Sequence, residues 1–525
     1  MRNFSSLLDD ILPKQLKEYF PKMDRGRKIA PRIDRKAGDV STTRAAYKKG
    51  DFIGKAYEVF GVLGVGGFSV VYLVYSHETE SAYALKTLRD QFLEDRETRD
   101  QFRKEAKLWV DLERHPYLVS ANFIDELGGR LYIGMEYIAP NEDGLNSLEG
   151  YLTHRPPDLL QTFRWAIQFC HGMEYARAKG IRCHRDVKPA NIMITADRIV
   201  KITDFGFAEV IDVTRAKHGM DLLSRRRRHM NDPTGFGTPT YMPPEQFQNA
   251  ARCDERSDIY SFGVVLYQMA SRGKLPFEPN LGHKGIGSDP VAVWREMHRM
   301  HTEAVVAPLQ SPLLPVIQRC LQKEPSGRYQ SFKELRQALD VLMKRYTGET
   351  VVPQQTKELE AWELYNKAFS LSSLGHTEEA IECYGKVLDL EPGNSDAWNN
   401  MGVCYRKLGR LDNALACYDK AIHVQRYNAS SWSNRGNILY TMGRFPESIV
   451  SLNKAIEIDP LNESAWLNKA LVEERLGLKG EAAISFQTFI DLKPVEYSAH
   501  LAYAQKRLAD LKARRARQQR RNPGT

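Results

Sequence analysis

The sequence predicts a multidomain α+β protein, with a domain of strands and helices over residues 51–345 followed by an all-α solenoid over residues 359–496. Two observations favour this fold class. A β-rich stretch around a glycine cluster at 63–71 gives way to helical patterns, and several residue types recur every 34 positions beyond residue 361. With 525 residues, the chain is long enough for two to four domains.

The composition is that of a globular protein. Apolar residues make up 42% of the chain and charged residues 27%, which excludes wholesale disorder and a collagen-like sequence. The seven cysteines are scattered and include no CxxC pair. A disulfide framework and a cysteine-ligated zinc site are therefore disfavoured, and we expect a reducing, cytoplasmic location. Because no apolar run reaches about 18 residues, we expect no membrane span.

The net charge of +9 is concentrated at the two ends of the chain. Residues 1–50 hold 13 Lys/Arg against 6 Asp/Glu, and residues 501–525 hold 8 against 1. A basic tail can contact nucleic acid or an anionic membrane. Since no nucleic-acid fold signature accompanies these charges, we disfavour nucleic acid as a partner. We expect a solvated basic tail at 517–525 and a flexible basic extension at 1–50.

Four sets of residues recur with a period of 34. They are Trp398, Trp432 and Trp466; Gly375, Gly409, Gly443 and Gly477; Ala380, Ala414, Ser448 and Ala482; and Pro392, Pro460 and Pro494, with Arg426 in the remaining proline slot. The pattern resembles the tetratricopeptide repeat (TPR), which consists of two antiparallel helices. The resemblance implies a linker at 346–358, four repeats over 359–496 and a capping helix at 497–516.

A row of asparagines keeps the same period: Asn366, Asn400, Asn434 and Asn468. They fall on the first helix of each repeat, which lines the inner groove in this family. An amide offers both a donor and an acceptor, so the row could hold the backbone of a peptide or protein partner. It resembles the asparagine ladder in the repeats of O-GlcNAc transferase. The alternative is hydrogen bonding between the helices of neighbouring repeats.

Short motifs follow one another through 51–345. They are Leu63-Gly64-Val65-Gly66-Gly67-Phe68-Ser69-Val70-Val71, Ala84-Leu85-Lys86, Glu105 in an amphipathic helix pattern, His184-Arg185-Asp186-Val187-Lys188-Pro189-Ala190-Asn191, Asp204-Phe205-Gly206, Gly237-Thr238-Pro239, and Pro243-Pro244-Glu245. Glycines let backbone N–H groups approach a phosphate without a Cβ clash. The ordered set resembles the eukaryotic-like (Hanks-type) serine/threonine protein kinases over about 290 residues.

The resemblance implies a bilobal protein-kinase fold, with a β-rich N-lobe, a helical C-lobe and ATP bound between them. It implies that Lys86 holds the nucleotide's phosphates and pairs with Glu105, and that Asp186 accepts the proton of the substrate hydroxyl. Lys188 would stabilise the transferred phosphoryl group. Asn191 and Asp204 would bind Mg²⁺, which prefers oxygen ligands.

The resemblance also implies the nucleotide-binding residues: glycines over the phosphates, apolar side chains around the base and a hinge that hydrogen-bonds adenine. They are Leu63, Gly64, Gly66, Val71, Ala84, Lys86, Met135, Glu136, Ile138 and Met193. Two departures from the family pattern, Ser69 for the third glycine and Pro243 for alanine, are not expected to affect the chemistry.

Regulatory and structural roles follow from the same resemblance. In this family Arg185 usually pairs with a phosphate on the activation loop, so we expect phosphorylation at Thr234 first and at Thr240 second. Thr238 is expected to contact Asp186. The four arginines at 225–228 are interpreted as a solvated insert, or alternatively as a site for phosphorylated Thr234 or an acidic partner.

Three further residues are implied to have structural roles. Asp258 should support the catalytic loop, and Glu245 should form a buried ion pair with Arg328.

The sequence thus predicts a serine/threonine protein kinase that uses ATP and Mg²⁺, with TPR repeats that recruit protein substrates or regulators. The alternative is a pseudokinase and TPR scaffold that binds nucleotide and partners without phosphotransfer. The intact Lys86, Glu105, Asp186, Asn191 and Asp204 argue against it. Whether the repeats form a platform or an autoinhibitory contact stays open.

Overall fold

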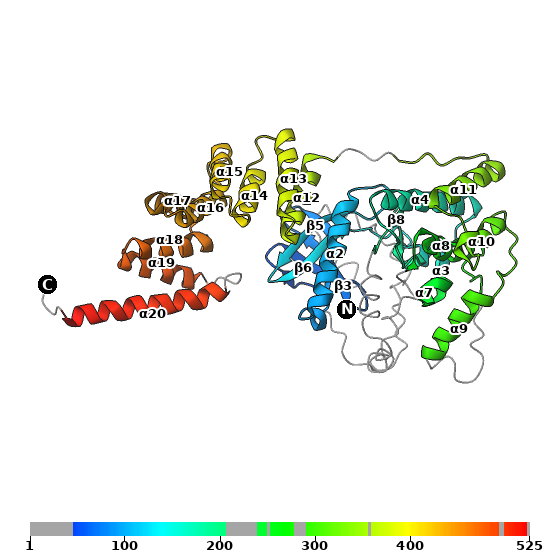
Figure 1. Ribbon diagram of the computed structural model, residues 1–525, viewed down its shortest axis with the longest axis horizontal. Coiled ribbons are helices and arrows are strands. Elements are labelled where there is room, and N and C mark those ends of the chain that lie inside the picture. The colour runs from blue at the N-terminus through cyan, green and yellow to red at the C-terminus, as the bar shows by residue number, and fades with distance from the viewer. Residues whose placement is uncertain are drawn as a thin grey trace. The chain divides into compact units, whose positions relative to one another are not determined.

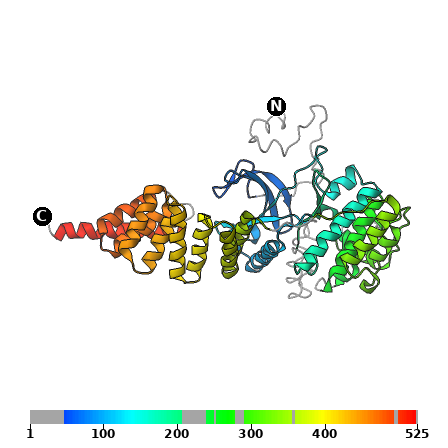
Figure 2. The same ribbon diagram turned by 90° about the horizontal axis from the view of Figure 1, so that it is seen from above.

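The computed structural model describes residues 46–205, 239–248, 252–277, 290–354, 359–492 and 498–521. The chain divides into two compact units, residues 1–358 and 359–525. The first is a β-sheet lobe followed by a helical lobe, and the second is made of helices (Figures 1 and 2). The expected bilobal fold and all-α solenoid are confirmed. None of the helices within the described ranges is long and apolar enough to cross a bilayer.

The N-lobe is built on one antiparallel sheet with the strand order β1-β2-β3-β4-β6-β5. The strands are β1 (Phe52–Ile53), β2 (Tyr57–Val65), β3 (Ser69–Ser76), β4 (Ser81–Leu88), β5 (Ala121–Leu127) and β6 (Arg130–Glu136). A short 3₁₀ turn, η2 (Asp90–Phe92), and helix α2 (Arg96–Leu112) connect β4 to β5. The hairpin between β2 and β3 carries the glycine cluster.

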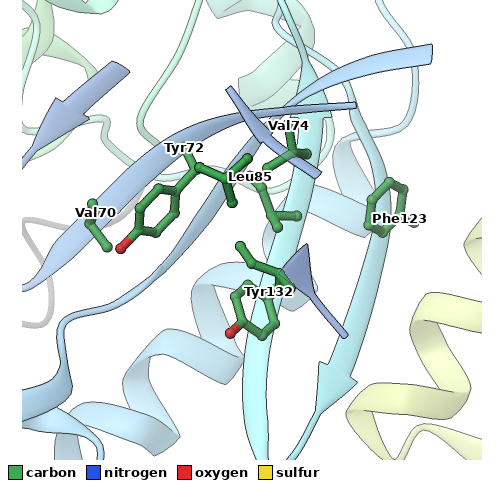
Figure 3. Close-up of a cluster of buried hydrophobic side chains, with 8 residues drawn as sticks. Val70, Tyr72, Val74, Leu85, Phe123 and Tyr132 are labelled. Atoms are coloured by element: carbon green, nitrogen blue, oxygen red, sulfur yellow. The ribbon is translucent and has the colours of Figure 1, made fainter. Parts of the chain in front are cut away.

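One face of this sheet forms an apolar core. Its buried members are Ile53, Val59, Val70, Tyr72, Val74, Leu85, Phe123 and Tyr132, six of which are labelled in Figure 3. Because side chains alternate along a strand, Val71, Ala84 and Lys86 project from the opposite face. The alternation therefore separates the residues that stabilise the lobe from those that the sequence assigned to nucleotide binding.

The described chain enters this core before residue 51. The hydroxyl of Tyr47 lies 3.2 Å from that of Tyr132, and its ring meets Tyr72 edge-on at 5.7 Å. Strand β1 then pairs with β2. The kinase unit thus begins at least four residues before the expected boundary at 51, whereas residues 1–45 lie outside the described residues.

Helix α2 begins at a cap and presents one apolar face. Asp95 accepts a hydrogen bond from the Thr98 amide at 3.3 Å, as an N-cap does. Phe102, Ala106 and Trp109, which lie three to four residues apart, are buried together with Glu105. A charged residue on the buried face of a helix requires a partner, and this one has Lys86.

The C-lobe is predominantly helical. Its elements are α3 (Leu148–His154), α4 (Leu159–Ala178), η3 (Pro189–Asn191), β7 (Ile192–Ile194), β8 (Val200–Ile202), η5 (Pro239–Tyr241), α7 (Pro244–Gln248), α8 (Glu255–Ala270), α9 (Pro290–Glu303), α10 (Leu314–Cys320), η8 (Pro325–Gly327) and α11 (Phe332–Thr347). Helix α8 is buried at every residue from 257 to 269, as expected of a central helix. Phe262 on α8 stacks on Phe169 of α4 at 4.1 Å, and Phe332 of α11 meets Phe169 edge-on.

The segment after α11 runs back along the kinase unit. Gly348, in the left-handed conformation, ends the helix, and the amide of Gln354 then donates to the hydroxyl of Tyr117 at 3.1 Å. Figure 1 shows the chain passing α4 on this path. The first part of the expected linker is therefore attached to the loop that follows α2, and residues 355–358 lie outside the described residues.

The second unit consists of four helix pairs and a final long helix. The helices are α12 (Ala361–Leu374), α13 (Thr377–Leu390), α14 (Ser395–Lys407), α15 (Leu411–Val424), α16 (Ala429–Thr441), α17 (Phe445–Ile458), α18 (Glu463–Arg475), α19 (Lys479–Asp491) and α20 (Ser498–Arg521). The glycine set ends the first helices: Gly375, Gly409, Gly443 and Gly477 have φ between 73° and 89°. The small residues permit close packing, since a Cβ on Gly402 would lie 2.7 Å from the Tyr418 ring.

Helix α20 covers the end of the array. Its Ala504, Leu508 and Leu511 are buried against Phe486 and Phe489 of α19. The helix continues to Arg521, five residues past the expected end of the capping helix at 516. The apolar face of the fourth repeat is thereby removed from water, as repeat arrays require.

Candidate active site

Lys86, Glu105 and Asp204 come together from β4, α2 and the loop after β8. The Lys86 ammonium Nζ lies 2.9 Å from Glu105 Oε1 and 2.7 Å from Asp204 Oδ1. The side chains of Lys86 and Glu105 are 3% and 1% exposed, whereas that of Asp204 is 39% exposed. The lysine of the buried ion pair therefore also contacts a carboxylate that is partly exposed to solvent.

The charges in this group stabilise one another. Burial would lower the pKa of Lys86, but the two neighbouring carboxylates outweigh it and raise that pKa. Burial would raise the pKa of Asp204, and attraction to Lys86 instead lowers it. The lysine is therefore held protonated and Asp204 ionised at neutral pH.

Asp186, Lys188 and Asn191 form a second cluster at the start of η3. Asp186 Oδ2 accepts hydrogen bonds from Lys188 Nζ at 2.8 Å and from Asn191 Nδ2 at 2.9 Å. Asn191 Nδ2 also donates to the carbonyl of Asp186. These contacts orient the Asp186 carboxylate, whose side chain is 30% exposed and so accessible to a substrate.

Asp258 of α8 holds the backbone before this cluster. Its two carboxylate oxygens accept the amides of His184 at 2.6 Å and Arg185 at 2.9 Å. Arg185 has a φ of +65°, a conformation that costs energy for a side chain other than glycine. The expected support of the catalytic loop by Asp258 is thus present as two hydrogen bonds to a strained turn.

Phe205 anchors the residue that follows Asp204. It is fully buried, meets the Trp109 ring edge-on at 5.6 Å and lies 4.7 Å from the His184 ring. The His184 ring also bonds the carbonyl of Thr203 at 2.9 Å. Through these contacts, α2 and the loop that carries His184 together position Asp204, which itself has a φ of +64°.

Arg89, which the motif analysis missed, holds the glycine hairpin. Its Nη1 donates to the carbonyls of Gly67 at 3.1 Å and Gly66 at 3.4 Å, and its amide donates to Phe68 O at 2.8 Å. Phe68 packs on Phe92 of η2 at 4.9 Å. No sequence signal identifies this role, because an arginine after a strand is ordinarily a solvated surface residue.

The residues expected around the base lie on neighbouring strands. Ala84 pairs with Met135 across β4 and β6, both are buried, and Val71 pairs with Lys86 across β3 and β4. Met193 lies on β7, whereas Leu63 on β2 is 46% exposed. The sheet register thus brings most of this set together.

The expected hinge, which starts at the last residue of β6, is connected to the C-lobe by two side-chain contacts. Lys201 Nζ lies 2.9 Å from Glu136 Oε2, and the Asn146 amide donates to the carbonyl of Ile138 at 2.9 Å. The sequence analysis named Glu136 and Ile138 but neither of these two partners.

Glu245 and Arg328 form the expected buried pair. Arg328 is fully buried, and its Nη1 and Nη2 lie 2.7 and 2.9 Å from the two oxygens of Glu245. Ser257 Oγ donates to the same carboxylate at 2.7 Å. Arg328 also donates to three backbone carbonyls, so all five of its N–H donors are satisfied.

The regulatory residues are only partly within the described ranges. Thr240 lies in η5 beside α7, but Thr234, Thr238 and the arginines at 225–228 lie outside the described residues. Their expected roles stay predictions.

The asparagine row bonds between helices. Asn400 Nδ2 donates to the Tyr365 hydroxyl at 2.8 Å, Asn434 Nδ2 to Asn399 Oδ1 at 3.0 Å, and Asn468 Oδ1 accepts from Asn437 at 3.0 Å. No such side-chain bond is recorded for Asn366 among the described residues. These contacts favour the helix-to-helix alternative for the last three positions.

The donor atoms suit the nucleotide and metal that the resemblance implies. Since Asn191 Nδ2 is used by Asp186, its Oδ1 is the atom available to a cation, as is Oδ2 of Asp204. Two hard oxygen donors match Mg²⁺, which retains water and phosphate ligands. The Lys86 ammonium beside them supplies the positive charge that phosphates require.

Comparison with known proteins agrees with this geometry. The family model of the protein kinase domain matches residues 57–340, and tetratricopeptide repeat models match 364–394, 395–428 and 429–462. The structure adds a fourth helix pair beyond those matches.

Three curated relatives cover the kinase part. A probable serine/threonine-protein kinase of Streptomyces coelicolor is 33% identical over 54% of this chain and 39% of its own length. The serine/threonine-protein kinase PknB of Mycobacterium leprae is 33% identical over 53% and 42%. A probable serine/threonine-protein kinase of Clostridium acetobutylicum is 29% identical over 57% and 42%. The chain thus matches about two fifths of each relative's length. With the family model covering more than half of the chain, this chain belongs to the protein kinase family and carries tetratricopeptide repeats after its kinase domain.

Proposed function

We propose that this chain is a serine/threonine protein kinase that transfers the γ-phosphate of ATP, with Mg²⁺, to hydroxyl groups of protein substrates. The observation that carries the proposal is the completeness of two clusters: Lys86 with Glu105 and Asp204, and Asp186 with Lys188 and Asn191. The family relatives named as serine/threonine kinases support the substrate class.

Each side chain has a defined role in this proposal. Asp186, oriented by Asn191, accepts the proton of the attacking hydroxyl. Lys188 contacts the same carboxylate and neutralises charge beside the reacting hydroxyl. Bound Mg-ATP would supply the phosphoryl group, and Asp204 and Asn191 would hold its metal. Lys86 would hold the phosphates, with Glu105 fixing its position.

The repeats provide the second part of the proposal. We infer that the groove lined by the first helices binds a peptide or protein partner and so recruits substrates or regulators. Asn366 remains the ladder position available to such a partner, because Asn400, Asn434 and Asn468 already bond neighbouring helices.

A phosphotransfer assay on the full-length chain tests the activity. We expect radiolabel from γ-labelled ATP to appear on serine and threonine of the chain itself and of a generic protein substrate. Asp186→Asn should remove this label. The variant should still bind ATP, as measured by calorimetry. Equal label in the wild type and Asp186→Asn would refute the assignment of the base. ATP binding without any label would favour the pseudokinase scaffold.

A further inference from the structure

The three tryptophans of the repeat ladder share one structural role. Each indole N–H donates to the carbonyl six residues earlier, from Trp398 to Pro392, from Trp432 to Arg426 and from Trp466 to Pro460, at 2.8 to 3.1 Å. Each ring therefore closes the turn before its own helix. What differs among the three is the group that covers the ring.

Two of the three rings are covered by a lysine. Lys420 Nζ lies 4.2 Å from the centre of the Trp398 ring, and Lys469 Nζ lies 5.3 Å from that of Trp466. A cation at this distance interacts favourably with an indole face and occupies the space above it. The two lysines thus cover one face of the Trp398 ring and one face of the Trp466 ring.

The equivalent positions at Trp432 also hold cations, but both are bound elsewhere. Lys454, 34 residues after Lys420, contacts Glu457 at 2.7 Å. Arg435, 34 residues before Lys469, contacts Asp419 at 2.6 Å and Ser451 at 2.7 Å. Among the described residues, no cation–π contact to Trp432 is recorded. The two cations at these positions are therefore held by other partners, and the half-buried Trp432 ring lacks the cation contact seen at Trp398 and Trp466.

A depression of about 650 Å³ lies over the Trp432 ring. It runs between the second helices α15 and α17, with Ile422 and Val450 as apolar walls and Asn453 beside them. Val450 is 65% exposed although it is aliphatic. An aromatic surface, aliphatic walls and an amide suit the side chain and backbone of a short peptide.

The charge at its edge selects the kind of peptide. Arg426 occupies the slot that proline holds at 392 and 460, and its side chain is exposed. The other polar residues that line the depression are His423, Asn453 and the ion pair of Lys454 with Glu457, so among the described residues Arg426 adds the one unbalanced charge of this lining. A guanidinium favours a carboxylate or phosphate partner. The basic ends of this chain, residues 1–50 and 501–525, are disfavoured as occupants because each carries a net charge of +7.

We propose that this depression, called here the Trp432 pocket, binds an acidic peptide segment in which an apolar side chain packs on Trp432 and a neighbouring carboxylate pairs with Arg426. Its walls come from the second helices α15 and α17, and Trp432 of the first helix α16 forms its floor. The site does not depend on phosphotransfer, so its failure and that of the proposed kinase activity are distinguishable.

Fluorescence anisotropy with the full-length chain tests the proposal. The probe is a fluorescein-labelled, end-blocked peptide, Gly-Glu-Leu-Glu-Phe-Gly, and its control has lysine in place of both glutamates. Val450→Glu adds a repelling charge to the pocket wall. Ile484→Glu is its matched control, because Ile484 lies 34 residues later and is 66% exposed. Arg426→Pro restores the residue of the neighbouring repeats and keeps the carbonyl that Trp432 needs.

We expect the acidic peptide to bind and the basic one not to bind. Val450→Glu and Arg426→Pro should each weaken binding about tenfold, the size of one charge-assisted contact, while Ile484→Glu should leave it unchanged. Circular dichroism should show the same helix content in all variants. Equal affinity of Val450→Glu and Ile484→Glu, binding of the basic peptide, or absence of binding to the wild type would overturn the proposal. So would a Val450-dependent retention on phosphatidylserine vesicles without peptide binding, which would indicate a lipid surface.

Discussion

The ammonium group of Lys86 lies between two carboxylates, 2.9 Å from Glu105 and 2.7 Å from Asp204, the latter 118 positions away in the sequence. Its contact with Glu105 ties β4 to α2, and its contact with Asp204 ties both to the loop that follows β8. The position of α2 and the position of the candidate metal ligand are therefore coupled through one side chain.

Substitution of Lys86 should lower both the stability and the activity of the protein, and a second substitution at Glu105 should restore only the stability. Lys86→Met leaves Glu105 buried without its partner, which should cost about 3–5 kcal/mol of unfolding free energy. Phosphotransfer should fall at least about 100-fold, because the charge beside the phosphates is lost. The double variant Lys86→Met with Glu105→Leu should recover most of the stability in urea denaturation and none of the activity. Recovery of activity in the double variant would contradict the role of Lys86.

The Glu245–Arg328 pair should dominate the stability of the C-lobe. Arg328→Met leaves Glu245 without its guanidinium, and we expect a loss of about 3–5 kcal/mol in urea denaturation. Arg155→Met is the control, because Arg155 makes an exposed pair with Asp143 and should change stability by less than about 1 kcal/mol. Equal losses of unfolding free energy in the two variants would contradict the prediction that the buried ion pair contributes more to stability than the exposed one.

His301 should make the kinase unit less stable in mild acid. Burial lowers its pKa to about 4, and the nearby Lys323 adds to this effect. The ring lies against Tyr260, Phe247 and Phe277. The unfolded chain takes up a proton near pH 6.5 and the folded chain does not, so stability should fall as the pH drops from about 6.5 to about 4.

The contribution of His301 to this loss of unfolding free energy can reach about 3 kcal/mol over the whole pH range. His301→Gln should therefore flatten the dependence of unfolding free energy on pH, measured in urea between pH 4 and pH 7. His154→Gln on the exposed end of α3 should not. His115 should keep a residual slope in both variants, because burial lowers its pKa to about 4 as well. An unchanged slope in His301→Gln would refute the prediction.

Arg89 should affect nucleotide binding more than turnover. Arg89→Met removes the donor to the carbonyls of Gly66 and Gly67, which should loosen the glycine hairpin and raise the KM for ATP about fivefold with little change in kcat. Steady-state kinetics with varied ATP measures this. Arg96→Met serves as the control, because the Arg96 side chain is 89% exposed and its ion pair with Asp100, at 3.8 Å, lies at the surface. An effect confined to kcat would point to a different role.

The asparagine row should stabilise the repeat domain, and its role should not be limited to the binding of a peptide partner. Asn434→Ala removes a bond to Asn399 on the neighbouring repeat, and a loss of about 1 kcal/mol is expected in denaturant unfolding. Asn366→Ala should cost less, since no such bond is recorded for it among the described residues. The reverse order of losses would argue against the helix-to-helix interpretation.

Local patterns accounted for much of the fold and the site. The order of the short motifs indicated the kinase domain through its resemblance to a known family. The 34-residue period placed the helix pairs, since Gly375, Gly409, Gly443 and Gly477 all adopt the left-handed conformation that ends a helix. Asp258 and the Glu245–Arg328 pair were also anticipated, through the family resemblance.

By itself, the sequence determined the repeat register, because it depends on residue type and spacing along the chain. Through the family resemblance of its motifs, it also indicated the fold class and the candidate catalytic residues. Only the tertiary structure decided which groups outside the family motifs meet across the chain. Arg89 on the glycine hairpin, Tyr47 in the sheet core and Gln354 at Tyr117 leave no pattern in the sequence. The same holds at Trp432, where Lys454 and Arg435 could each cover the ring. Nearby carboxylates bind them instead, and such a competition is settled by distances that a linear sequence does not contain.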